Sequence, residues 1–124
     1  MSLIEAGDFR FEIDPGWGRL PNGWRAGVVT GVVVDSQDRV YLCQQQQDPP
    51  VLVFDREGNY LDSWGAGYVV EPHTMYIGSD DVIYLADRGA HVAMKLSVNG
   101  EVPVSYTHLR AHETELLSRM PSSA

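Results

Sequence analysis

The sequence predicts an all-β chain built from a repeated unit of short antiparallel strands. Residues 30–65 and 73–102 repeat the same order of apolar runs and turns 43 positions apart. The runs are four to six residues long and are separated by clusters of Asp, Asn, Ser and Gly. No segment before residue 105 has the periodicity of a helix. A period of roughly 40–50 residues made of short strands is typical of β-propeller blades. We therefore predict about two four-stranded blades, an incomplete propeller, with a C-terminal tail outside it.

Individual residues fix the register of the repeat. Turn residues fall on turn residues and apolar residues on apolar residues, which two unrelated segments would not do. The aligned pairs are Val34 with Ile77, Asp38 with Asp81, Tyr41 with Tyr84 and Leu42 with Leu85, and, at a shift of 42, Gly58 with Gly100.

The chain divides into four parts in this interpretation. Residues 1–29 form a lead-in with one strand at 9–13, residues 30–72 a first blade, residues 73–104 a second, incomplete blade, and residues 105–124 a tail. In the first blade the strands are expected at 31–34, 39–43, 51–55 and 60–64, and the second repeats their order. The apolar run 31–34 is expected to be buried on both faces.

Turn chemistry supports these boundaries. Asp35–Asp38 and Gly78–Asp81 join the first two strands of each unit, and Asp or Ser side chains can bond their own backbone there. Gly58 and Gly100 supply the positive φ of the later hairpins. We expect Trp17, Trp24 and Trp64 to pack between blades.

Composition limits the classes of partner. The net charge of −8, from 9 basic and 17 acidic residues, argues against nucleic acid. No apolar run reaches the ~18 residues of a membrane helix, and the N-terminus lacks the basic and apolar regions of a signal peptide. The single Cys43 allows no internal disulfide and is expected to be a small buried side chain. None of this fixes the cellular compartment.

The tail breaks the pattern. Its sequence SYTHLRAHET (105–114) continues no strand alternation, and it looks like translated read-through of a sequencing-library adapter. His108 and His112 have helical i, i+4 spacing, but two histidines without a third ligand make a weak metal site. We therefore expect the tail to be non-native.

The repeat resembles NHL-repeat six-bladed β-propellers, and within them the peptidyl-α-hydroxyglycine α-amidating lyases and their bacterial relatives. The resemblance covers about residues 10–102, roughly two blades of six, so the chain looks like an N-terminal fragment. It rests on GWGRLPNGW at 16–24, the Thr-Gly-Val start at 30–32, SWG at 63–65 and the Pro72-His73 pair.

The resemblance implies a zinc-dependent lyase that cleaves a carbinolamide C–N bond to an amide and glyoxylate. Such lyases hold zinc with three histidines from three blades, the first in a Pro-His motif, which here makes His73 the candidate ligand. They also bind calcium through two backbone carbonyls, at the positions of Val32 and Met75. Zinc and calcium are thus expected in the complete protein, and neither is expected to bind firmly to this chain alone. A strand-capping role for His73 remains open.

One position departs from the family. An arginine that faces the substrate carboxylate is replaced here by Gln45, which is neutral and cannot form the bidentate clamp of a guanidinium. Asp87 and Arg88 are weaker catalytic or anion-binding candidates, with a structural ion pair or a solvated loop as the alternative. His91 is expected to be structural.

Two classes of function stay open. One is a lyase, active in the complete protein and inactive as this chain alone, with a small peptide-like substrate. The other is a non-catalytic propeller that binds a ligand or a protein partner. In either case an isolated pair of blades should leave the apolar rows 32–34 and 83–85 exposed, which predicts self-association through open blade edges.

Overall fold

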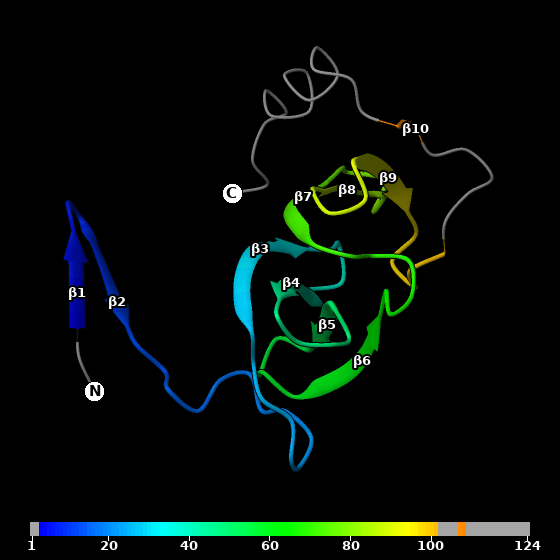
Figure 1. Cartoon of the computed structure of the whole chain (residues 1–124). Helices are drawn as coiled ribbons and strands as arrows, with labels where there is room; N and C mark the ends of the chain where they lie inside the picture. The colour runs from blue at the N-terminus through cyan, green and yellow to red at the C-terminus, as the bar shows by residue number, and fades with distance from the viewer. Residues whose placement is uncertain (1–2, 102–106, 109–124) are drawn as a thin grey trace.

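The computed structural model describes residues 3–101 and 107–108, and within these residues every regular element is a β-strand. An N-terminal hairpin is followed by two four-stranded antiparallel sheets that lie side by side (Figure 1). The strands are β1 (Leu3–Ala6), β2 (Phe9–Glu12), β3 (Val28–Val34), β4 (Val40–Gln45), β5 (Val51–Phe54), β6 (Tyr60–Trp64), β7 (Pro72–Ile77), β8 (Ile83–Asp87), β9 (Val92–Leu96) and β10 (Thr107–His108). The predicted all-β class is confirmed.

Each sheet is a meander that follows the sequence repeat. Blade 1, as we call the first sheet, has the order β3-β4-β5-β6, and blade 2 has the order β7-β8-β9-β10. The inner strands β3 and β7 are neighbours in space (Figure 1). Within the described part of the chain no helix is long and apolar enough to cross a membrane.

A short piece of the tail joins blade 2. Thr107 pairs with Ala93 and His108 with Val92, which makes β10 a two-residue edge strand where the sequence indicated none. The rest of the region 102–124 lies outside the described residues, and so does the expectation that the tail is non-native.

The hydrophobic core lies within and between the two blades. It combines side chains from β4, β5 and the inner face of β3 with those of β7, β8 and β9. Its members are Val33, Tyr41, Cys43, Val51, Val53, Trp64, Val69, Met75, Ile77, Ile83, Leu85, Val92, Met94 and Leu96. Cys43 is fully buried, and burial raises the pKa of its thiol, as expected of a small apolar side chain.

Two expectations about burial were wrong. The run 31–34 is not buried on both faces, because Val33 faces blade 2 while Val32 and Val34 point to the opposite, open side of β3. Conversely, Ile83 and Leu85 are fully buried, because β8 lies inside its sheet and packs against blade 1. The open apolar row is therefore found on blade 1 and not on β8.

The turns form as the sequence predicted. Asp38 and Asp81, which the repeat aligns, both have left-handed backbones with φ of 61° and 60°. The Asp35 carboxylate accepts hydrogen bonds from the backbone N–H groups of Gln37 and Arg39, each at 2.9 Å. Carboxylates that close a turn in this way fix the connection between antiparallel strands.

The same carboxylate makes the stability of the fold depend on pH. Burial alone would raise the pKa of Asp35, but hydrogen bonds from the Tyr41 hydroxyl (2.7 Å) and from Arg39 outweigh it and hold this pKa below its usual 3.8. Burial and the Asp35 carboxylate in turn raise the pKa of Tyr41 above 10.

We therefore expect melting temperature to fall at both ends of the pH range. The contribution of Asp35 is complete above its unfolded pKa and is lost as the pH falls through the lower, folded value. That of Tyr41 is complete below about pH 10 and is lost above it, since only the unfolded phenol ionises there. Thermal melts from acid to alkaline pH test this. Tyr41→Phe should flatten the alkaline side, and an unchanged alkaline slope in that variant would contradict the assignment.

The tryptophans divide into two roles. Trp64 is buried against Gly100 of blade 2 and packs between blades, as predicted. Trp17 and Trp24 instead pack the lead-in against blade 1. The ring centroid of Trp17 lies 5.3 Å from that of Phe54, and the ring centroid of Trp24 lies 5.5 Å from that of Tyr60.

Candidate functional site

Both inner strands carry an irregularity at the same place. The pairing of β3 with β4 shifts between Val29 and Gly31, and that of β7 with β8 shifts between Pro72 and Thr74. The extra residues are Thr30 and His73, which the repeat aligns at a shift of 43. A β-bulge redirects the side chain of its extra residue, and bulges are common beside functional sites.

The two bulges and the end of β4 are joined by one carbonyl group. The backbone oxygen of Pro72 accepts a hydrogen bond from the Thr30 hydroxyl at 2.9 Å and another from the Gln45 side-chain amide at 2.9 Å. We call Thr30, Gln45, Pro72 and His73 the strand-end cluster. Its two hydrogen bonds join residues 42 and 27 positions apart, and they fix the backbone directly before His73.

His73 is the chemically versatile member of this cluster. Its side chain is exposed and makes no hydrogen bond to any other described residue. The strand-capping role therefore has no bond in its support. A neutral imidazole on a rigid strand is suited to binding a borderline metal ion such as zinc.

One imidazole is not a metal site. Across residues 3–101, no three His, Cys, Asp or Glu side chains are grouped so as to hold a metal ion. Zinc sites need three or four ligands. The residues here thus fit zinc only as donors of a single ligand, and the other ligands must come from elsewhere.

Gln45 is held in place by the cluster. Its amide nitrogen is occupied by the Pro72 carbonyl, and its side chain is half-buried. The neutral amide thus tethers β4 to β7. No charge for binding a carboxylate is supplied there.

The two expected calcium positions lie on adjacent strands. Val32 follows Gly31 on β3, and Met75 is its counterpart on β7. The strands approach closely because residue 31 is glycine: a Cβ there would lie 3.2 Å from the Met75 nitrogen and 3.0 Å from the Cys43 sulfur. Calcium binding by these backbone carbonyls stays a prediction.

Asp87 and Arg88 do not form a pair. The Asp87 carboxylate is fully buried and accepts hydrogen bonds from the backbone N–H groups of Val70 (2.7 Å), Glu71 (2.9 Å) and Ala90 (3.1 Å). The Arg88 guanidinium instead bonds the Glu71 carboxylate, with its Nε at 2.9 Å. Asp87 therefore organises the loops around blade 2, a role that its place at the end of a strand did not reveal.

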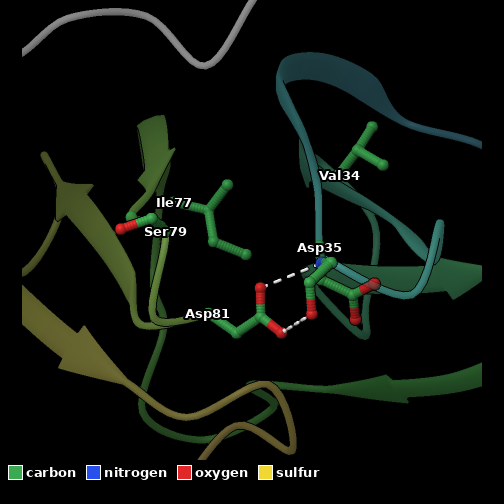
Figure 2. Close-up of a pocket in the computed structure, with 7 residues that line it drawn as sticks. Val34, Asp35, Ile77, Ser79 and Asp81 are labelled. Atoms are coloured by element: carbon green, nitrogen blue, oxygen red, sulfur yellow. Dashed lines mark hydrogen bonds between the residues drawn. The ribbon is translucent and has the colours of Figure 1, made fainter.

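Two surface hollows, each of about 300 Å³, flank the inner strands. One lies among the glutamines beyond β4 and is lined by Gln44, Gln46, Gln47, Asp48 and Val70. The other lies between the first turns of the two blades and is lined by Val34, Asp35, Ser36, Ile77, Gly78, Ser79 and Asp81 (Figure 2).

The Asp81 side chain reaches from blade 2 across the second hollow to blade 1. Its carboxylate accepts hydrogen bonds from the Ser36 backbone N–H at 2.9 Å and the Ser36 hydroxyl at 2.5 Å (Figure 2). The sequence identified Asp81 as a turn residue, but its contact with the other blade was missed. The signal was present, because both turns carry a serine followed two positions later by an aspartate.

No family model matches the sequence, and no curated protein matches it. Among solved structures, the chain is similar to virginiamycin B lyase from Staphylococcus aureus, a β-propeller, with a TM-score of 0.50 and 13% identity. The match covers 69% of this chain and 28% of that one, so the chain spans about a quarter of the length of this neighbour. An identity this low shows the fold alone. This structural similarity and the two repeated antiparallel sheets together show that the described residues form part of a β-propeller fold.

Proposed function

We propose that this chain contributes two blades to a lyase of the β-propeller type, and that the strand-end cluster is its part of the active site. The observation that carries the proposal is His73, an exposed imidazole on a bulge whose preceding carbonyl is fixed by two hydrogen bonds. The similarity to a solved β-propeller, itself a lyase, supports the propeller fold on which the proposal rests. The resemblance to amidating lyases supports the finer assignment.

The reaction is the cleavage of a carbinolamide. The substrate hydroxyl loses its proton, a carbonyl forms as the C–N bond breaks, and the leaving amide nitrogen takes up a proton. Zinc, when bound, would supply the positive charge that lowers the pKa of the substrate hydroxyl. His73 would hold one coordination position, and the remaining ligands and the base would come from other blades.

The rest of the cluster has a positioning role in this proposal. Thr30 and Gln45 hold the Pro72 carbonyl and thereby the orientation of the β7 bulge. Groups that orient a metal ligand commonly affect metal affinity by about 10–100-fold. Because Gln45 carries no charge, the substrate group beside it should be bound through neutral hydrogen bonds. We assign the carbonyls of Val32 and Met75 to a structural calcium ion, which suits oxygen ligands.

Zinc titration of the complete propeller, in which the other ligands are present, tests the assignment of His73. His73→Asn should weaken zinc binding at least about tenfold, since a ligand contributes no less than the residues that orient it. Competition with a chromophoric chelator measures this without any assay of activity. His91→Asn is the matched control: His91 is also exposed, and asparagine tolerates its left-handed backbone (φ 55°).

Equal zinc affinity in the wild type and the His73 variant would remove His73 as a ligand. Ligand binding by the complete propeller without any lyase turnover would instead favour the non-catalytic binding module.

A further inference from the structure

The contact between the two blades shows how one blade of this chain binds another. Asp81 of blade 2 accepts two hydrogen bonds from Ser36 of blade 1 (Figure 2). Met75 and Ile77, from the inner strand of blade 2, are buried against blade 1 with 8% and 7% of their surface exposed. Blade 2 thus binds the preceding blade through one carboxylate and two apolar side chains.

Blade 1 carries the same three groups on its open face. Val32 and Val34 are 53% and 47% exposed, although the aligned residues of blade 2 are buried. Asp38 is exposed as well, and its Oδ2 lies 3.9 Å from Nη1 of the exposed Arg56. The aligned pairs, at a shift of 43, are Val32 with Met75, Val34 with Ile77 and Asp38 with Asp81.

Blade 2 presents the complementary group on its own open side. Ser79 aligns with Ser36, lies in the equivalent turn and is exposed, and its side chain points away from Asp81 (Figure 2). Ser36 is held by the Asp81 carboxylate, whereas no described residue bonds the Ser79 hydroxyl. The outer face of blade 1 therefore offers a carboxylate and two valines. The outer side of blade 2 offers the serine that such a carboxylate binds.

The lead-in determines what kind of blade fits the open face of blade 1. A Cβ at Gly58 would lie 2.8 Å from the Trp17 ring, and one at the aligned Gly100 would lie 2.5 Å from the Trp64 ring. Trp64 belongs to the outer strand of blade 1, which precedes blade 2. Trp17 thus occupies the place where the outer strand of a blade preceding blade 1 would stand.

A blade that docks on blade 1 must therefore lack most of its own outer strand. In the described part of the chain, the outer strand β10 of blade 2 spans two residues, which pair with Ala93 and Val92.

We propose that the open face of blade 1 binds blade 2 of a second copy of this chain, head to tail. Asp38 of one copy binds Ser79 of the next, and Val32 and Val34 are covered by the β7–β9 sheet. Because the two contacting surfaces differ, the assembly extends head to tail, as a ring where the rotation between copies closes and as a filament where it does not. This inference is independent of the proposed function and does not involve His73.

Sedimentation equilibrium of the full chain, with two variants that each block one face, tests the proposal. The wild type should sediment as a multiple of 13.8 kDa. Val34→Asp on blade 1 and Ser79→Arg on blade 2 should each raise the dissociation constant at least tenfold. Mixed together, the two variants should form a 1:1 dimer, because each retains the face that the other has lost.

The exposed β1–β2 hairpin is the rival apolar surface, and it provides the control. Phe9→Ser with Phe11→Ser should leave assembly unchanged, since neither side chain contacts a blade face. Circular dichroism checks that each variant is folded, and Val32→Lys repeats the blade 1 test should Val34→Asp fail to fold. A monomeric wild type, a mixture that stays monomeric, or assembly lost with the hairpin variant and kept with Val34→Asp would overturn the proposal.

Discussion

Replacing Asp87 with alanine is expected to destabilise the fold by about 3 kcal/mol or more. Three backbone N–H groups, those of Val70, Glu71 and Ala90, donate to this buried carboxylate at 2.7–3.1 Å. Hydrogen bonds to charged groups contribute about 1.5–3 kcal/mol each, and donors left buried without a partner add their desolvation cost. The loss should fall on the whole fold, because the loop from 70 to 71 leads into the inner strand β7.

Urea denaturation followed by tryptophan fluorescence measures this effect, since Trp64 lies in the core that the blades share. Asp62→Ala is the control. Asp62 is an exposed residue on β6, and its carboxylate accepts a hydrogen bond from the backbone N–H of the adjacent Ser63. Loss of this side chain should lower the free energy of unfolding by less than about 0.5 kcal/mol. Similar midpoints for both variants would show that Asp87 does not organise these loops.

Gly100→Ala is expected to cost about 2–4 kcal/mol. Gly100 has a φ of 79°, a left-handed conformation that costs other residues about 1–2 kcal/mol. The added methyl group would also meet three atoms of the Trp64 ring at 2.5–2.8 Å, and overpacking of this kind costs about 1–3 kcal/mol. Part of the damage should appear at the contact between blades, because Trp64 belongs to blade 1 and Gly100 to blade 2.

Gly67→Ala separates the two contributions. Gly67 has a comparable φ of 93°, but a Cβ there would meet nothing within 4 Å. Its substitution should therefore carry only the conformational cost, about 1–2 kcal/mol. Equal denaturation midpoints for the two alanine variants would show that the Trp64 ring moves aside for the added methyl group without lowering the free energy of unfolding.

Much of the fold could be predicted from the sequence because the signals are local. The apolar runs of the short strands and the short polar side chains at Asp35 and Asp38 act within a few positions, and both turns formed as expected. The repeat of 43 residues then placed the second blade. At the site, the sequence singled out His73 through a motif, and the structure puts it on a bulge aligned with Thr30.

The errors share a cause. A strand of three valines reads as fully buried when no neighbour is specified, yet Val32 and Val34 are exposed because the blade that would cover them is not among the described residues. Asp87 and Arg88 are adjacent in sequence, and adjacency suggested a pair. Asp87 ends β8 and Arg88 lies in the turn that follows, so Asp87 meets the backbone of the loop before β7 while Arg88 meets the Glu71 carboxylate.

By itself, the sequence determined the strand order, the turns and the two-blade repeat, since these depend on side-chain periodicity and backbone preference within short segments. Only the tertiary structure decided which face of each inner strand is covered, and that Thr30, Gln45 and Pro72 meet beside His73. Those contacts join residues up to 42 positions apart, and the packing of one blade on another brings them together.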